Sequence, residues 1–356
     1  MSAQPTEISL SLVPSSRFAT IDVARYVENE YEGFCEAYPR GLYCSLHTTA
    51  GFLDRSLSSR LDHSAERVDQ FIGAFQTLFP PEQDYRHDQL HLRHELSEEQ
   101  KRVEPRNADS HLTFMGAGMR NCVTYLNRPG QPVYFIDLDG VNGKVQRERR
   151  TRVLGYQEEE VVDRRTLEVP VSRHPIDSIN LADPRDGFLE RIDEVIAREG
   201  IQKGRIDLAL DPAESRAALT VNEYETLLMR HDLPHVLRNP LRHAAIKGRN
   251  MIRDPLAIPG KTMNYAKYDF VQVFNQLLEA LHISDSVLER LLARFLALPA
   301  ERFLRMKRSV SFLVSDGDTG RPGRLVRGRY QSPILVQWGA AEAQRRRVTL
   351  SLVRFK

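Results

Sequence analysis

The order of strand-like and helix-like segments occurs twice in this sequence, and this repeat restricts the fold more than any other feature. Alternating apolar and polar residues predict strands at 8–13 and 166–171, and a helical pattern follows each, at 21–34 and 187–200. More strand-like runs follow in each half, at 41–46, 121–126, 133–138 and 151–156, and at 205–210, 309–314, 332–338 and 347–353. Because a repeat in sequence indicates a repeat in structure, we expect two copies of one α+β unit.

The length of 356 residues is enough for two domains of ordinary size. We predict one domain over residues 1–160 and a second over 161–356, with an extra helical segment around 234–298. The charged run EEEVVDRR at 158–165 is the best candidate for a linker. A solvated surface explains this run equally well.

Charge and cysteine content exclude some classes of protein. A net charge of +2 without a basic tail gives no reason to expect a nucleic-acid partner. No stretch approaches the roughly 18 apolar residues of a membrane span, and the first residues lack the features of a signal peptide. The three cysteines, Cys35, Cys44 and Cys122, form no disulfide framework, so we expect a reduced, cytoplasmic protein.

Three segments place histidines beside small or polar residues. They are LHTTAGF (46–52), YRHDQLHLRHE (85–95) and NADSHLTFMGAG (107–118). Three imidazoles with an open position describe a catalytic zinc site, although these spacings match no short zinc motif. Surface or capping histidines are the plainer interpretation of each, and an Asx-rich turn before a strand explains the third segment as well.

Together these segments resemble the YjbQ-like family of small, trimeric, β-rich proteins, often described as secondary thiamine-phosphate synthases. Four motifs occur in the family's order between about residues 8 and 156. They are His47-Thr48-Thr49-Ala50-Gly51, Tyr85-Arg86-His87-Asp88, Ser110-His111 with Met115-Gly116-Ala117-Gly118, and Asp137-Leu138-Asp139-Gly140 followed by Arg149, Arg150 and Arg152. The resemblance implies a mainly β, α+β fold with two tandem β-sandwich domains flanked by helices.

Each half departs from the family pattern in a different place. The first half has Arg55-Ser56 where the family has Asn-Glu, and it lacks the Gly-x-Trp-Gln element. The second half has Asn222-Glu223, and Gly328-Arg329-Tyr330-Gln331 resembles the missing element. Counting eight residues back from Asn222 leads to Glu214 instead of histidine. We therefore interpret the chain as a tandem duplication with complementary losses; a second half that is only structural, with Asn222 as a helix cap, is the alternative.

The predicted site combines residues of both halves. We expect catalytic roles for His47, His87, His111, Asp139 and Glu223, with the three histidines as metal ligands. We expect substrate contacts from Thr48, Thr49, Gly51, Tyr85, Arg149, Arg150, Asn222 and Gln331. Thr48, Thr49 and the N–H groups near Gly51 could hold a phosphate, and Asp137 and Asp139 would share one face of a strand.

The resemblance implies a metal-dependent enzyme acting on a small phosphorylated metabolite. Its named activity joins a pyrimidinylmethyl diphosphate to a thiazole phosphate, which normally needs Mg²⁺, whereas three histidines favour zinc. It also implies a homo-oligomer with trimer-like packing. The alternative is a non-catalytic protein that binds a metal or metabolite, or serves as a scaffold, with a structural second repeat.

Overall fold

The computed structural model describes residues 4–81, 83–143, 145–238 and 304–356. Its elements alternate between short helices and strands, as a mainly β, α+β protein requires. In the first half they are β1 (Thr6–Leu12), β2 (Ala19–Asp22), α1 (Val23–Glu30), α2 (Phe34–Ala37), β3 (Arg40–Ser45), β4 (Ala50–Gly51), α3 (Arg55–Arg60), α4 (Ala65–Leu78), the 3-10 turn η1 (Leu90–Leu92), α5 (Glu98–Val103), α6 (Ala108–Gly116), β5 (Cys122–Leu126), β6 (Tyr134–Asp137), β7 (Val141–Asn142), β8 (Val145–Gln146) and β9 (Arg149–Tyr156).

The second half begins with a long edge strand and ends with a long central one. Its elements are β10 (Glu159–Pro170), β11 (Ile176–Asn180), the 3-10 turn η2 (Pro184–Asp186), α7 (Phe188–Arg198), β12 (Gly204–Leu210), β13 (Ala217–Asn222), the π-helical turn η3 (Leu228–Asp232), α8 (Leu233–Arg238), β14 (Ser309–Ser315), β15 (Arg324–Val326), β16 (Ser332–Trp338), the 3-10 turn η8 (Glu342–Gln344) and β17 (Arg345–Phe355).

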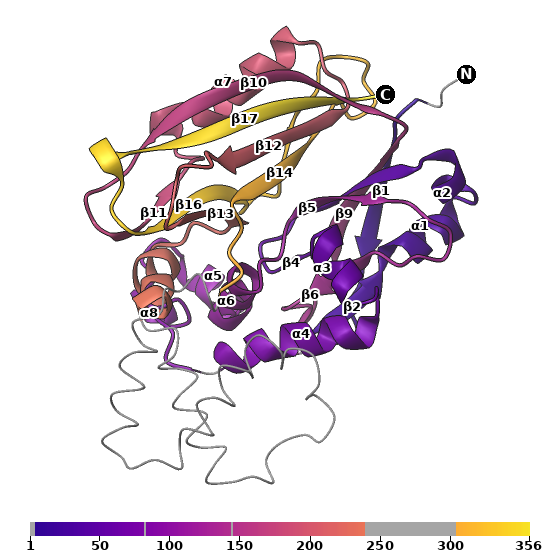
Figure 1. The fold of residues 1–356 in the computed structure, drawn as a ribbon. Helices are drawn as coiled ribbons and strands as arrows, with labels where there is room; N and C mark the ends of the chain where they lie inside the picture. Colours follow the sequence, from indigo (N-terminus) through magenta and orange to yellow (C-terminus); the bar gives the residue numbers. More distant parts are fainter. Residues whose placement is uncertain (1–3, 82, 144, 239–303) are drawn as a thin grey trace, which may run out of the picture.

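The two halves have the same strand order. The first half contains a sheet β1-β9-β3-β5 and a smaller sheet β2-β6-β4, and the second contains β10-β17-β12-β14-β15 and β11-β16-β13. Taken in chain order, each strand of these two first-half sheets has its counterpart in the second half, where β15 is added at one edge; the β7-β8 hairpin of the first half has none among the described residues. The α1 and α7 helices follow the second strand of their halves (Figure 1). This common topology is the arrangement that an internal duplication would give; the duplication itself stays a prediction.

In each half the two sheets face each other and enclose an apolar core. Val153, Tyr43 and Phe135 belong to the core of the first half, and Leu350, Phe312 and Leu335 to the core of the second. The alternating residues of the strands place these side chains on one face. The β-sandwich predicted for each half is therefore present.

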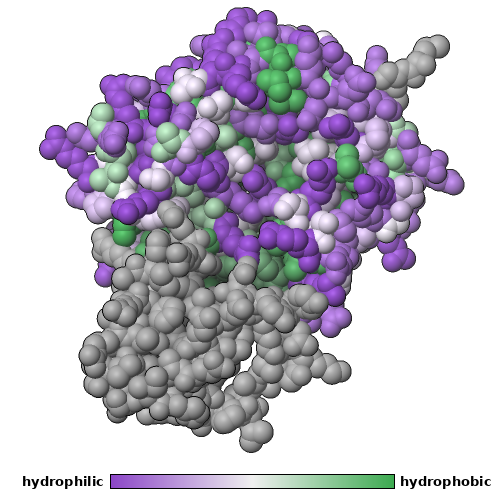
Figure 2. All heavy atoms as spheres, viewed as in Figure 1, coloured by the Kyte–Doolittle hydropathy of each residue, from purple (hydrophilic) through white to green (hydrophobic). Residues whose placement is uncertain are grey.

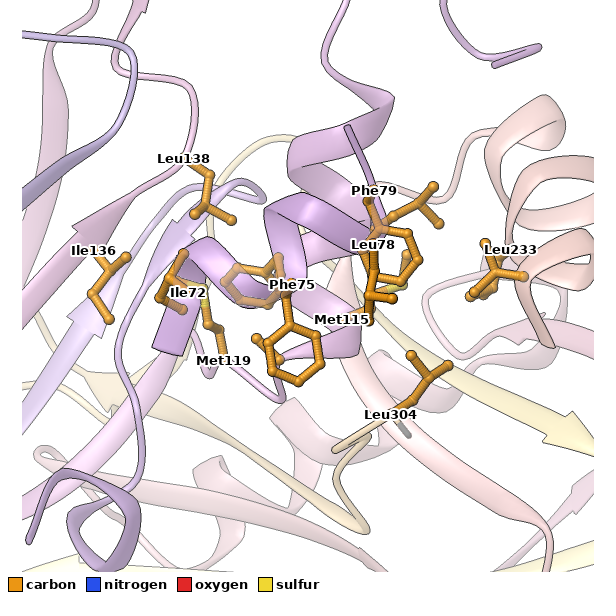
Figure 3. Packing of buried hydrophobic residues seen from close by; sticks show 14 of the residues in the cluster. Ile72, Phe75, Leu78, Phe79, Met115, Met119, Ile136, Leu138, Leu233 and Leu304 are labelled. Carbon is orange, nitrogen blue, oxygen red and sulfur yellow. The ribbon is translucent and has the colours of Figure 1, made fainter. Parts of the chain in front are cut away.

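Two further apolar clusters join the halves. In one, the α4 and α6 helices of the first half pack against α8 and β16 of the second, and Figure 3 shows the side chains that meet there, with Phe75 and Met115 near Leu233 and Leu304. In the other, the outer face of β3, β5 and β9 packs on β14 and β17, where the Tyr156 and Phe355 rings stack with centroids 3.8 Å apart. The halves consequently share part of their buried apolar surface.

The structure corrects three of the expectations from sequence. The charged run 158–165 is not a linker but the start of the edge strand β10, which pairs with β17; charged side chains are typical of exposed edge strands. The segment 107–118 contains the helix α6 and not a turn leading into a strand. The Cys44 and Cys122 sulfurs, which face each other across β3 and β5, form a disulfide, while Cys35 is buried and free.

Some expectations lie partly outside the described residues. Of the extra helical segment predicted around 234–298, the structure describes only the part up to residue 238, within α8. In the described part of the chain, no helix is long and apolar enough to cross a membrane. The face drawn in Figure 2 is mostly hydrophilic where it is coloured.

Candidate active site at the junction of the two halves

A hydrogen bond between the halves fixes the protonation of His111. The ring lies on α6, which packs against β13, and its Nδ1 is 2.6 Å from Oδ1 of Asn222 at the end of that strand. The same Oδ1 accepts the N–H of Glu223, while Nδ2 of Asn222 donates to the Thr48 carbonyl. Because Oδ1 is thus the acceptor, Nδ1 of His111 carries a proton and Nε2 of the neutral ring has a free lone pair.

The free nitrogen of His111 faces a carboxyl group. Nε2 lies 3.9 Å from Oε2 of Glu223, too far for a direct hydrogen bond. His111 is buried, and burial together with the positive charge of His87 holds its pKa well below the usual value. Burial also raises the pKa of Glu223, against the opposing charges of His87 and Arg93. A neutral imidazole therefore stands opposite a carboxyl group that binds a proton more readily than usual.

The neighbouring ring of His87 has acceptors on both nitrogens. Nδ1 is 3.0 Å from Oε2 of Glu225, and Nε2 is 3.3 Å from Oδ1 of Asn107. The amide nitrogen of Asn107 donates to Asp139, which confirms that its oxygen faces His87. Both ring nitrogens are thus donors, as in an imidazolium.

The ionisation of His87 agrees with this geometry. Burial works to lower the pKa of His87, but its hydrogen bond to Glu225 and the carboxylate charge outweigh burial and raise the pKa. The pKa of Glu225 is lowered because its bond to His87 and two backbone N–H groups outweigh burial. The His87 and His111 rings meet edge to face with centroids 5.3 Å apart. A charged imidazole thus lies beside a neutral one.

His47 has a different environment from the other two histidines. Its Nε2 accepts the backbone N–H of Arg150 at 2.8 Å, and its Nδ1 is 3.5 Å from the Arg149 guanidinium. Burial and then the charges of Arg149, Arg147 and Arg150 lower the pKa of His47 to about 3. His47 therefore stays neutral and joins the ends of β3 and β9.

The predicted three-histidine metal set does not fit this geometry. Nε2 of His47 accepts the Arg150 N–H, which leaves the proton of the neutral ring on Nδ1, and both nitrogens of His87 face acceptors, so neither ring offers a free lone pair to a metal ion. Across the described ranges, no group of three His, Cys, Asp or Glu side chains is placed to hold a metal. In this arrangement His47, His87 and His111 do not form a ligand set, and a metal at these residues stays a prediction.

The two predicted aspartates each bind a separate arginine and do not act as a pair. Asp137 accepts two hydrogen bonds from Arg149, at 2.6 and 2.8 Å, and is fully buried. Asp139, just beyond β6, binds Arg147 and the Asn107 amide. Arg149 also donates to the Asp139 carbonyl, so its guanidinium is engaged inside the protein and is not free for a substrate. The guanidinium of Arg150 lies on the exposed side of β9.

A turn of the second half supports the end of β3. The side-chain amide of Gln331 donates to the carbonyls of Ser45 and His47, and its oxygen accepts the N–H of Gly328. Gly328 lies directly on the Leu46 carbonyl, where a Cβ atom would clash with the backbone. Gln331, predicted to contact substrate, instead holds the loop that carries His47.

The remaining predicted substrate contacts are occupied by the fold. Thr49 is buried and its carbonyl accepts the N–H of Leu138; Gly51 lies in β4, pressed against the Arg120 backbone. Tyr85 is buried, and its hydroxyl donates to the Pro80 carbonyl. Thr48 contributes its carbonyl to Asn222. These contacts engage the carbonyls of Thr48 and Thr49, and a phosphate held at 48–51 stays a prediction.

Four important residues were not predicted from sequence: Glu225, Asn107, Arg147 and Arg93. Glu225 follows Glu223 by two residues in NEYE, and Asn107 opens the NADSH segment, so both lie beside predicted residues. Only the fold reveals their partners, since Glu225 meets a ring 138 positions away.

The second half has surroundings like those of His47, but another residue stands in place of the histidine. Phe52 bridges to Arg120 and Leu219 to Lys307, so Leu219 is the counterpart of Phe52 and Glu214 that of His47. Glu214 accepts the N–H of Arg347 at 2.9 Å and pairs with Arg346, as His47 does with Arg150 and Arg149. This register agrees with the count from the sequence motifs.

The fold and this cluster define a class of protein: a mainly β chain with two topologically equal sandwiches and a buried histidine–carboxylate site at their junction. Similar solved structures include a YbjQ-like protein of unknown function from Sulfolobus solfataricus P2, 18% identical with a TM-score of 0.28, which aligns over 55% of this chain and 99% of its own. A hypothetical protein from Aeropyrum pernix K1 is 15% identical, with a TM-score of 0.29 and coverages of 54% and 98%.

An uncharacterised conserved protein of the YjbQ/UPF0047 family from Clostridium acetobutylicum is 12% identical, with a TM-score of 0.24 and coverages of 53% and 98%. These neighbours name the family that the sequence motifs resemble, and they are consistent with a YjbQ-like domain over about half of this chain. No protein-family model and no curated protein matches the chain. Since all three TM-scores are below 0.5, the arguments that follow rest on this chain's own residues.

Proposed function

We propose that the junction site is an acid–base catalytic site for a small phosphorylated metabolite. The observation that supports this most is Nε2 of His111, which has no hydrogen bond to a described residue and lies 3.9 Å from the Glu223 carboxyl. His111 would accept a proton on Nε2, and Glu223, whose raised pKa makes it easier to protonate, would take up and pass on a proton. A neutral imidazole with a free lone pair and a carboxyl group with a raised pKa are groups that can act as base and acid in general acid–base catalysis.

Fixed positive charge beside His111 supports the same proposal. The imidazolium of His87 lies next to the His111 ring, and Glu225 and Asn107 hold it in place. Such a preorganised charge would stabilise negative charge that develops on a ligand at His111. His87 has no lone pair in this state, so its role would be electrostatic.

Two arginines could attract the phosphate group. Arg147 is about one-third exposed, and its charge acts on both His47 and His111, whose pKa values it lowers. Arg150 is exposed on β9 in the same neighbourhood. Guanidinium groups bind phosphate oxygens through charge-assisted hydrogen bonds. The family resemblance implies transfer to a thiazole phosphate; the residues support only the broader class of reaction, and no step here uses the three-histidine metal set.

The test is a search for turnover with matched variants. The protein is incubated with a panel of phosphorylated metabolites, the proposed thiamine-phosphate precursors included, and conversion is followed by ³¹P NMR. We expect His111→Gln and Glu223→Gln each to lower the rate by a factor of about 10² to 10⁴. Glu190→Gln, on the exposed face of α7, is the control. Full activity in Glu223→Gln would contradict the proposal.

One observation favours a second candidate, a non-catalytic junction. His87 and His111 are each only 1% exposed, and their bonds to Glu225 and Asn222 join the halves as a buried polar network. A network of this kind can specify how two units pack. In that case no metabolite is converted, and Glu223→Gln changes neither ligand-induced thermal shifts nor any rate.

A further inference from the structure

The segment between His87 and α6, residues 89–104, is attached to the rest of the protein by few buried side chains. Of the side chains of residues 89–104, only that of Arg93 is buried, and Leu90, Leu92 and Leu96 are half-buried. The helices η1 and α5 in this segment bury no residue at all. A stretch of this length with so few buried apolar contacts belongs to the low-stability end of a structure.

The hydrogen bonds of the segment are local. The N–H groups of Leu92, Arg93, Leu96, Lys101 and Glu104 all donate to carbonyls between residues 89 and 100. Its side-chain bonds are local too, such as the capping box of Ser97 and Gln100 and the pair of Lys101 and Glu98. Among the described residues, no hydrogen bond ties residues 90–104 to the sheets or to the second half.

Arg93 makes the one ionic contact that the described structure shows between this segment and the second half. Its guanidinium binds Glu95 at 2.7 Å and Glu104 at 2.8 Å, which closes the segment on itself. Its other terminal nitrogen is 3.6 Å from Oε1 of Glu223. Glu223 is also the carboxyl that faces His111, and its side chain is 21% exposed. The segment is therefore fastened at the edge of the site.

We propose that residues 89–104 form a lid over the His111–Glu223 pair, and that Arg93 is its latch. When the latch is released, the segment moves away as a unit, because its internal bonds do not depend on the rest of the protein. Opening gives solutes access to Nε2 of His111. The importance of this lid rests on the proposed function, but its movement is a property of the structure that can be measured without turnover.

Chemical modification of His111 tests the lid directly. Diethyl pyrocarbonate reacts with unprotonated imidazole nitrogens, and Nε2 of His111 is one. The modification rate of each histidine is measured by mass spectrometry of the intact protein's digest, with exposed His174 as the internal reference. We expect Arg93→Gln to increase the rate at His111, relative to His174, by a factor of about 2 to 5, because a partly exposed ion pair contributes a factor of that order to an opening equilibrium.

Two further variants complete the experiment. Arg102→Gln, an exposed arginine of the same segment, should leave the rate at His111 as in the wild type. Glu104→Gln weakens the latch without touching Glu223, and should also raise the rate; it serves if Arg93→Gln does not fold, which circular dichroism reveals. Equal His111 rates in wild type, Arg93→Gln and Glu104→Gln overturn the lid, whether or not the site proves catalytic.

Discussion

The hydrogen bond from His111 to Asn222 decides which nitrogen of this ring carries the proton. Replacing Asn222 with leucine keeps a similar volume but leaves the buried Nδ1–H without an acceptor, which should lower the free energy of unfolding by about 1–3 kcal/mol. Asn222→Asp keeps an acceptor and adds a negative charge, so the pKa of His111 should rise. Urea denaturation measures the first effect and ¹⁵N NMR of the ring the second. A His111 tautomer that is the same in Asn222→Leu would contradict the assignment.

The pKa of His47 gives a second prediction at this scale. The folded-state pKa of about 3 lies below the ordinary value of 6.5, so below pH 6.5 protons bind preferentially to the unfolded chain and stability is lost as the pH falls. Between pH 7 and pH 5 this costs about 2 kcal/mol. Raised carboxyl pKa values, such as that of Asp109 at about 6, oppose the trend, so the comparison must be between variants.

His47→Gln isolates this effect, because glutamine offers an acceptor to the Arg150 N–H but does not titrate. Denaturation by urea at pH 7 and pH 5 should show a loss of stability about 2 kcal/mol larger in the wild type than in His47→Gln. Equal losses in both proteins would mean that His47 becomes charged in the folded state.

The position of His47 requires an acceptor for one backbone N–H. This follows from comparing the ends of β3 and β9 with those of their counterparts, β12 and β17. One half uses His47 and the other Glu214 to accept the same backbone N–H beside an arginine. We therefore expect His47→Glu to fold with a melting temperature close to that of the wild type, since the new carboxylate lies beside Arg149 and Arg150. Differential scanning calorimetry measures this. A fall of more than about 3 °C, the order of a 2 kcal/mol loss for a chain of this length, would show that the surroundings of His47 and Glu214 are not equivalent.

Gly51 in the short strand β4 and Gly73 in the helix α4 form a contrasting pair of glycines. A Cβ on Gly51 would clash with the Arg120 carbonyl, to which the chain bonds through Phe52, so Gly51→Ala should destabilise the protein by about 1–3 kcal/mol. Gly73 lies inside α4 with nothing near its Cβ position, so Gly73→Ala should stabilise by up to about 1 kcal/mol. Urea denaturation compares them. If Gly51→Ala leaves the free energy of unfolding unchanged, a role of this loop in ligand binding stays open.

Helices and strands whose apolar residues recur at a regular spacing were predictable from the sequence. Elements that depend on contacts with segments far away in the sequence were not. The alternation in β1, β12 and β17 is visible in the residues, because each strand buries one face. The α6 helix was missed since Asn107, Asp109 and Ser110 are typical turn residues, and all nine residues of the helix are buried, so no polar face marks its period. The charged start of β10 looked like a linker because the sequence does not show its partner β17.

The site itself was predictable only in part, and for a similar reason. Motif order placed His111 together with Asn222 and Glu223, although they lie 111 and 112 positions apart. Motifs could not show that Nε2 of His47 and both nitrogens of His87 already have hydrogen-bond partners in the fold. Nor could they show Glu225 or Arg93, because the roles of both depend on contacts between the halves.

At the scale of the molecule, the two halves share their buried surface, and this predicts how the chain unfolds. The cluster around α4 and α6 includes Leu233 and Ile334 of the second half, so neither sandwich keeps its full core alone. We expect one cooperative transition. Trp338, the single tryptophan, lies in the second half, and its fluorescence should therefore change at the same urea concentration as the far-UV circular dichroism of the whole chain.

The shared core also bears on the homo-oligomer, which stays a prediction. Since Asn222, Glu223 and Glu225 reach His111 and His87 within one chain, the junction site needs no second copy. Dilution should therefore leave the ¹⁵N signals of these two rings unchanged, even where sedimentation shows that a larger assembly dissociates. If the ring signals follow the dissociation instead, a neighbouring copy contributes to the site, and the second half does not complete it alone.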